Sequence, residues 1–155
     1  YAKGKYEGEK HIIDDQLNQW LSQLRSKVGA TGKITVVADA CHSGGGSRGD
    51  EDESEYVVRG TSDAFVIPGN PKPFSGEVGT IDWIFISACK SYQCNYEYKG
   101  TGSLTYALGQ QKASLSSTPA QQIQRSIRSI IANIIPFTQT PVLEASVEGT
   151  QQSLF

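Results

Sequence analysis

The chain has 155 residues, 37% of them hydrophobic and 19% charged, with a formal net charge of −2. This length favours a single domain with a sizeable core. The weak negative charge and the lack of a basic cluster argue against nucleic-acid binding. No apolar run approaches the length that crosses a membrane, which argues against a membrane protein.

The three cysteines, Cys41, Cys89 and Cys94, favour neither a disulfide framework nor a zinc site, because their number is odd and no C-x-x-C pair occurs. At least one free thiol is expected. No signal peptide is visible, and the polar first ten residues resemble a loop. A missing upstream segment would explain that start, so we expect a soluble protein but predict no compartment.

The first regular element is predicted at residues 14–28, where Asp14 or Asp15 can cap a helix and Gly29 can end it. We expect this helix to cover one face of a sheet. Its apolar residues recur on one side at helical spacing: Leu17, Trp20, Leu21, Leu24 and Val28.

Residues 33–39 predict a strand that is buried on both faces, because the run ITVVA is apolar and β-branched. Polar and reactive side chains follow where this strand ends, at Asp39 and Cys41. Ligands of open α/β sheets bind beyond the carboxyl ends of the strands. Cys41 is therefore a candidate nucleophile, and Gly44 and the two glycines after it would let a substrate backbone come close.

The remaining pattern alternates strands, loops and helices. An acidic loop follows at residues 47–60, then a strand at 81–87 and a loop at 91–102 in which tyrosines could line a pocket or simply pack. Helices are predicted at residues 103–111 and from Thr118, as cap, to Ile134, with a last strand at 141–146. This order favours a mostly parallel sheet with helices on both faces.

Four segments resemble the metacaspases and their bacterial caspase-like relatives, in family order, across residues 12–146. The most specific is DACHSG at residues 39–44, which resembles the family's nucleophile motif. Weaker matches are DDQL at 14–17, ISACK at 86–90 and GSLTYAL at 102–108. The resemblance implies one caspase-like domain over residues 1–155, folded as the later part of a three-layer α/β/α sandwich.

The resemblance also implies a cysteine endopeptidase with Cys41 as nucleophile and its backbone N–H as one oxyanion donor. In the family, the base is a histidine in an upstream Y-S-G-H-G motif that this chain lacks. His42 is a poor substitute because adjacent residues on an extended segment point to opposite sides. Either the base lies on an upstream segment or partner chain, or the protein is an inactive caspase-like binding or regulatory module.

Asp39 is the candidate specificity residue, because it lies two positions before Cys41 and both side chains point to the same side of an extended chain. A carboxylate there would select Arg or Lys, and metacaspases with this Asp cut after those residues. The alternative is that Asp39 caps a turn. Cys89 is expected to be a buried structural cysteine, with a place in the pocket wall as its other interpretation.

The expected partners are a peptide or protein substrate with Arg or Lys at the cut, and an N-terminal fragment of the same precursor that carries the histidine. If the enzyme cuts after basic residues, Arg48 and Arg59 are candidate self-processing sites. No cofactor is required by this chemistry. Calcium is a weak candidate, because Asp14 and Asp15 match positions that hold it in some metacaspases.

Overall fold

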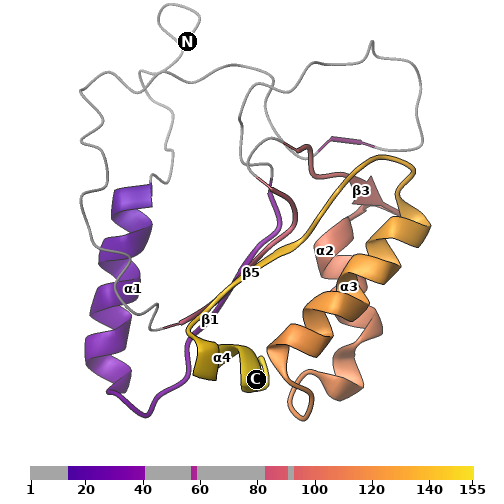
Figure 1. Ribbon diagram of the computed structural model, residues 1–155. Coiled ribbons are helices and arrows are strands. Elements are labelled where there is room, and N and C mark those ends of the chain that lie inside the picture. Colours follow the sequence, from indigo (N-terminus) through magenta and orange to yellow (C-terminus); the bar gives the residue numbers. More distant parts are fainter. Residues whose placement is uncertain (1–13, 41–56, 59–82, 91–92) are drawn as a thin grey trace, which may run out of the picture.

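A computed structural model describes residues 14–40, 57–58, 83–90 and 93–155. Helix α1 (Asp14–Val28) lies on one side of the central strands, and α2 (Ser103–Gln110) and α3 (Ala120–Ile134) lie on the other (Figure 1). None of the helices in this part of the chain is long and apolar enough to cross a membrane. The chain has an α/β fold built on a small mixed sheet.

The central sheet has the strand order β1 (Thr35–Ala38), β2 (Ile84–Ser87), β5 (Val142–Glu144). β1 and β2 are parallel, with Thr35 opposite Ile84, whereas β5 runs antiparallel to β2. Among the described strands the sheet is therefore mixed, and the prediction of a mostly parallel sheet is wrong for β5. The chain reaches β5 from the end of α3 at the same sheet edge where β2 ends, so it returns in the opposite direction.

The main core lies between the sheet and the pair α2 and α3. β2 contributes Ile84 and Ile86, which are 3% and 0% exposed. The apolar stripe predicted for α3 is confirmed, because Ile123, Ile127 and Ile131 are buried while Ile130 and Ile134 pack against the same cluster. Burial of this stripe, rather than helix propensity, holds α3 in place.

The opposite face of the sheet is covered less completely than the sequence predicts. α1 begins and ends as expected, and Gly29 ends it with a φ of 72°. However, Trp20 is 50% exposed and Val37 of β1 is 40% exposed. The prediction that β1 is buried on both faces is therefore wrong, because α1 buries mainly Leu21 and leaves much of its apolar stripe in solvent.

Three local features differ from the sequence predictions. α3 begins one residue late, with Pro119 rather than Thr118 at the N-cap. Within the expected loop lies a hairpin of β3 (Glu97–Tyr98) and β4 (Thr101–Gly102), whose turn residues Lys99 and Gly100 both have positive φ. Such a two-residue turn matches the twist of a hairpin. A short helix, α4 (Val147–Gln151), follows Ser146, whose hydroxyl accepts from Gly149 N.

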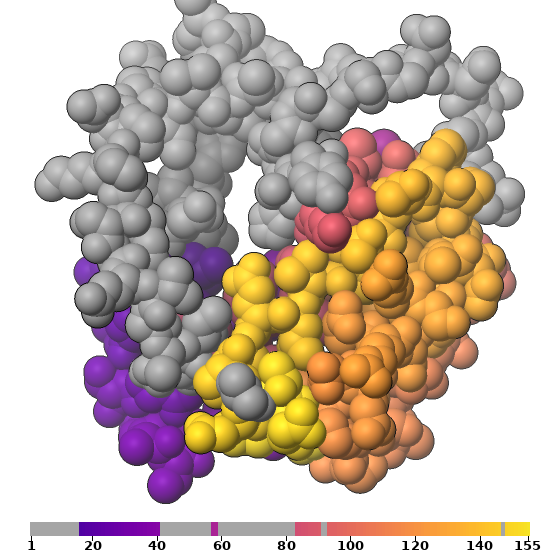
Figure 2. All heavy atoms as spheres, in the orientation of Figure 1, coloured from indigo at the N-terminus to yellow at the C-terminus, as the bar shows by residue number. Residues whose placement is uncertain are grey.

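The residues after α4 make contact with the segment at the start of β1. Leu154 is fully buried, and its carbonyl accepts from Thr35 Oγ1 at the start of β1. Lys33 Nζ donates to the Ser153 carbonyl at 3.0 Å. In the space-filling view the yellow C-terminal region lies between α1 and α3 (Figure 2). The C-terminal residues thus connect parts of the chain that are far apart in sequence.

Candidate functional site

The candidate site lies at the carboxyl ends of the parallel strands β1 and β2, where Asp39 and Ala88 leave the sheet. Ala88 N donates to Ala38 O at 3.0 Å, so the two strand ends are held side by side. The hairpin of β3 and β4 lies at the same end of the molecule (Figure 1). This is the edge at which open α/β sheets bind their ligands.

The Asp39 carboxylate is held by donors from two other segments. Its Oδ1 accepts from Asn95 Nδ2 at 2.7 Å. Its Oδ2 accepts from Thr105 N at 2.9 Å and from Thr105 Oγ1. Both of these donors are neutral groups, and their two contacts fix the orientation of the carboxylate.

Thr105 is the third residue of α2, a helix whose N-cap is Gly102 and which has no side-chain cap of its own. The first amides of a helix lack partners within the helix and favour a nearby negative charge. Asp39 supplies that charge from 66 positions upstream in the sequence. The alternative offered by the sequence was that Asp39 caps a turn; in the structure its carboxylate instead accepts from the first turn of α2, which is distant in sequence.

Behind Asp39 lies a buried polar cluster formed by Asn95, Ser103 and Gln139. Asn95 and Ser103 are fully buried, and Gln139 is 6% exposed. Asn95 Oδ1 accepts from Ser103 Oγ at 3.1 Å and from Gln139 Nε2 at 2.9 Å. Buried amides of this kind are stable only when their hydrogen bonds are made. The cluster fixes the orientation of Asn95, and hence the direction in which its amide donates to Asp39.

Gln139 also connects this cluster to the two neighbouring backbones. Its Nε2 lies 3.1 Å from the Ala88 carbonyl at the end of β2, and its Oε1 accepts from Tyr96 N at 3.2 Å. One side chain therefore ties the end of β2 to the segment that enters β3. A rigid backing of this type is what a binding or catalytic side chain requires.

Cys89 is buried next to this cluster. It is 1% exposed, and its Sγ donates to the Gln93 carbonyl at 3.3 Å. Gln93 Oε1 in turn accepts from Thr140 N at 2.9 Å. These contacts favour a structural role for Cys89 over a place in a pocket wall. Cys89 and Cys94 are both free thiols.

The tyrosines of the described part of this region pack against one another and against the core. Tyr96 stacks on Phe137 with ring centroids 4.8 Å apart, and Tyr98 meets Tyr106 edge to face at 4.9 Å. Both Tyr96 and Tyr98 contact the core cluster. Of the two interpretations offered by the sequence, packing is the one that this geometry favours.

A short segment from the middle of the chain pairs with β3 at the same end of the molecule. Val58 forms an antiparallel bridge with Tyr96. Glu97 N donates to the Val57 carbonyl at 2.7 Å. The two valines thus contact the β3 side of the hairpin through an isolated bridge and one further backbone hydrogen bond.

Several predicted site residues lie outside the described residues: Cys41, Gly44, Arg48 and Arg59. The structure therefore gives the position of Asp39 but not of the predicted nucleophile two residues later. Asp14 and Asp15 are the first two residues of α1, so they lie within the helix rather than at the N-cap position that the sequence suggested for one of them. Within the described ranges no group of three or more His, Cys, Asp or Glu side chains could hold a metal ion.

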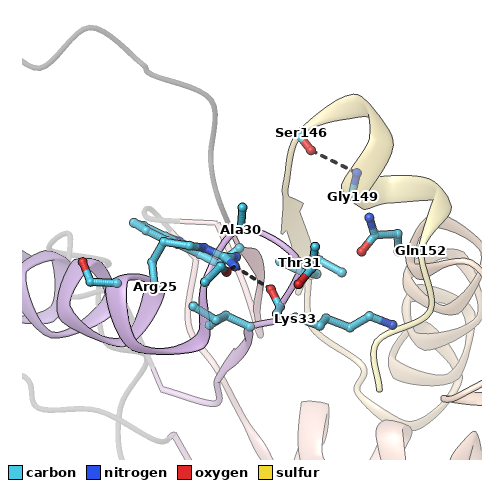
Figure 3. Close-up of a pocket in the computed structure, with 13 residues that line it drawn as sticks. Arg25, Ala30, Thr31, Lys33, Ser146, Gly149 and Gln152 are labelled. Carbon is cyan, nitrogen blue, oxygen red and sulfur yellow. Dashed lines mark hydrogen bonds between the residues drawn. The ribbon is translucent and has the colours of Figure 1, made fainter.

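A separate cavity of about 760 Å³ opens at the other end of the sheet, near the start of β1 (Figure 3). Its cationic side chains are engaged with neighbouring backbone. Arg25 Nη1 donates to the carbonyls of Gly29 and Gly32 and closes the C-terminal turn of α1, while Lys33 reaches Ser153. We assign no chemistry to this cavity.

Sequence reasoning found Asp39 but missed the residues that hold it. Asn95, Thr105 and Gln139 are ordinary polar residues in loops or at a helix start, and no local pattern marks them. The only available signal was the general rule that a buried carboxylate needs partners.

Comparison with known proteins adds nothing to this assignment, because no family model, no curated protein and no solved structure matches the chain.

Proposed function

We propose that the protein is a caspase-like cysteine endopeptidase that cleaves after Arg or Lys, with Cys41 as nucleophile and Asp39 as the residue that selects the basic side chain. On this proposal the α/β fold is the later part of a three-layer α/β/α sandwich. The observation that carries it is the oriented carboxylate of Asp39, at the carboxyl end of β1 and two residues before Cys41.

The orientation of Asp39 supports a role in recognising a cation. Asn95 and Thr105 donate to the two carboxylate oxygens and so fix the direction in which the carboxylate faces. Asp39 is half-buried, so a guanidinium or ammonium next to it would be screened less than on an open surface. Arg would gain most, since its planar donors match a carboxylate.

The proposed chemistry is acyl transfer to a thiolate. Cys41 Sγ attacks the carbonyl carbon of the substrate's basic residue, and its backbone N–H is one donor to the resulting oxyanion. The amine leaves with the thiol proton, and water hydrolyses the thioester. The proton passes through an imidazole base that this proposal assigns to an upstream segment or partner chain, because this chain lacks the family's Y-S-G-H-G motif.

The test is cleavage of fluorogenic peptides that end in Arg, Lys or Asp by the precursor that includes the upstream segment. We expect cleavage of the Arg and Lys peptides only, and none by Cys41→Ala. Asp39→Asn keeps an acceptor for Thr105 but removes the charge. It should lower kcat/KM on basic peptides by roughly 100-fold, as the loss of a charged contact does.

The matched control is Glu144→Gln, which removes an exposed carboxylate at the end of β5. It should leave kcat/KM unchanged. An inactive precursor, with and without calcium and after limited proteolysis, would overturn the proposal. If iodoacetamide then labelled Cys41 no faster than the half-buried Cys94, the chain would be better described as a caspase-like binding or regulatory module.

A further inference from the structure

We propose that Cys89 and Cys94 are a site of reversible oxidation, at which a small-molecule disulfide converts the two thiols into an internal disulfide that restrains the segment carrying Asn95. Both cysteines lie in the described part of the chain, and the structure shows them in the reduced form. The inference does not depend on the proposed function, because neither thiol takes part in the chemistry assigned to Cys41.

The two cysteines flank a reverse turn. Gln93 N donates to the Lys90 carbonyl at 2.9 Å, which is the hydrogen bond between the fourth and the first residue of a β-turn. Cys89 directly precedes this turn and Cys94 directly follows it, while residues 91 and 92 lie outside the described residues. A β-turn reverses the direction of the chain, so the residues on its two sides face one another. The turn therefore brings the two thiols onto facing arms.

The sulfur of Cys89 already reaches across this turn. Its Sγ donates to the Gln93 carbonyl oxygen at 3.3 Å. That oxygen belongs to the peptide bond before Cys94, so it lies about 2.8 Å from the Cys94 Cα. The Cys89 Sγ is thus within about 6 Å of that Cα. Because disulfides join residues whose Cα atoms are about 4.4–6.8 Å apart, side-chain rotation can form the bond without a change of fold.

The second arm of the turn is held in place by the Gln93 side chain. Its Oε1 accepts from Thr140 N at 2.9 Å and from Lys90 N at 3.3 Å, and its Nε2 donates to Thr140 Oγ1 at 3.3 Å. These contacts fix Gln93, and with it the backbone that enters Cys94. Two groups held at a fixed separation react as if one were present at a high effective concentration.

The burial of the two thiols assigns them different steps. Cys89 is 1% exposed, whereas Cys94 is half-buried. A dissolved oxidant reacts with the thiol that it can reach, so Cys94 reacts first. Cys89 then resolves the product from inside the fold, where a second molecule of the oxidant has no access.

The oxidation is a pair of thiol–disulfide exchanges. The Cys94 thiol loses its proton to solvent, and its thiolate attacks one sulfur of the small-molecule disulfide; a mixed disulfide forms and one reagent thiolate leaves. The Cys89 thiol loses its proton in turn, and its thiolate attacks the Cys94 sulfur and expels the second reagent thiolate. The two protein thiols lose two electrons, and the reagent disulfide gains them as it becomes two thiols. The Gln93 carbonyl loses only a weak S–H donor.

The consequence for the candidate site follows from what lies next to each cysteine. Cys94 is bonded to Asn95, whose amide donates to the Asp39 carboxylate at 2.7 Å. Cys89 is bonded to Ala88 at the end of β2. A disulfide would therefore join the segment that orients Asp39 to the end of β2 by a covalent bond. Oxidation should limit the opening of this region without removing any hydrogen bond to Asp39.

The bonding test uses the full chain with Cys41→Ser, in which these two thiols are the only ones left. The protein is equilibrated with mixtures of reduced and oxidised glutathione, alkylated and digested. Trypsin cuts after Lys90, between the two cysteines, so the internal disulfide appears as two linked peptides. We expect linked peptides from a protein that remains monomeric on a non-reducing gel. Glutathione adducts on Cys94 without linked peptides at any ratio, or linkage only between two copies, would overturn the inference.

The placement of the two thiols by the fold is tested by the equilibrium constant of the same reaction. It should be at least about tenfold larger in buffer than in denaturing urea, because the folded turn holds the pair in position. Gln93→Leu should lower the constant in buffer about threefold or more, since it removes the contacts to Thr140. The matched control is Gln122→Leu at an exposed position of α3. Equal constants in buffer and urea, or equal constants for the two variants, would contradict the placement.

The effect on the site is measured by hydrogen exchange of the reduced and oxidised forms. The Tyr96 amide, which donates to Gln139 Oε1 at 3.2 Å, should exchange about threefold or more slowly after oxidation. The Gly149 amide in α4, bound to Ser146 Oγ, serves as a distant control and should not change. Unchanged or faster exchange at Tyr96 would show that the disulfide does not restrain this segment and would overturn the inference.

Discussion

Replacing Asp39 by alanine should destabilise the chain by about 1–4 kcal/mol, and most of this cost comes from the groups that remain. The Asn95 amide is fully buried and would lose its 2.7 Å acceptor. A buried donor without a partner costs about 1–3 kcal/mol. Thr105 N, near the start of α2, would lose a carboxylate at 2.9 Å, which is worth about 0.3–1 kcal/mol at a helix N-terminus.

Urea denaturation followed by far-UV circular dichroism measures this change. With a slope near 2 kcal/mol per molar urea, a loss of about 3 kcal/mol lowers the midpoint by about 1.5 M. Asp39→Asn should cost less than Asp39→Ala, because its side-chain oxygen can still accept from Thr105. Glu144→Gln, at an exposed carboxylate, should stay within about 0.5 kcal/mol of the parent chain.

The reasoning would be refuted if Asp39→Ala matched Glu144→Gln. That result would mean that the carboxylate is not held by Asn95 and Thr105, and the support for a preorganised cation site would go with it. If Asp39→Asn were stable and kept full activity on Arg peptides, the hydrogen bonds of Asp39 would be supported but its role in specificity would be contradicted.

Three further predictions concern the fold and the support of the site. Ile127→Ala should destabilise the chain by about 2–5 kcal/mol in urea, because it opens a cavity in the core, whereas exposed Arg128→Ala should change little. Gln139→Leu should cost about 1–3 kcal/mol, because the Ala88 carbonyl loses this donor and Tyr96 N loses this acceptor. Near-UV circular dichroism should then show a less ordered tyrosine environment. A parental near-UV spectrum and midpoint would contradict this role. Gly29→Ala should destabilise the chain by about 1–2 kcal/mol, because the φ of Gly29 is 72°. Gly109→Ala, inside α2, should stabilise it by about 0.5–1 kcal/mol. If both variants changed the free energy of unfolding in the same direction, the backbone argument would be contradicted.

The parts of the fold that the sequence predicts are those with a strong local period. The apolar spacing of α1 and α3 and the β-branched runs of β1 and β2 define these elements to within a few residues. The direction of β5 is different, because nothing in a strand's own residues states whether it runs parallel or antiparallel to its neighbour. The hairpin turn at Lys99 and Gly100 lacks the Asn-Gly or Asp-Gly signature, so it was predicted as loop.

The candidate site also combines residues that a local sequence pattern predicts with residues that it does not. Asp39 and Cys41 follow a predicted strand, and that position alone made them candidates. Asn95 and Gln139 act through contacts with segments more than 40 positions away in the sequence, at Asp39 and Ala88. No local pattern encodes such a partner, because any of many loop amides could have turned inward. Long-range polar contacts therefore had to come from the three-dimensional structure.

The contact between the residues after α4 and the start of β1 also bears on how the protein folds during synthesis. Thr35 and Lys33 are bound by Leu154 and Ser153, about 120 positions later in the sequence. Leu154 completes a core to which β2 and α3 contribute much earlier. A ribosome-bound chain that has not yet released residue 154 lacks this closure, whatever follows it. This part of the chain therefore cannot complete its folding before residue 154 has been made, and contacts of such long range favour slow folding.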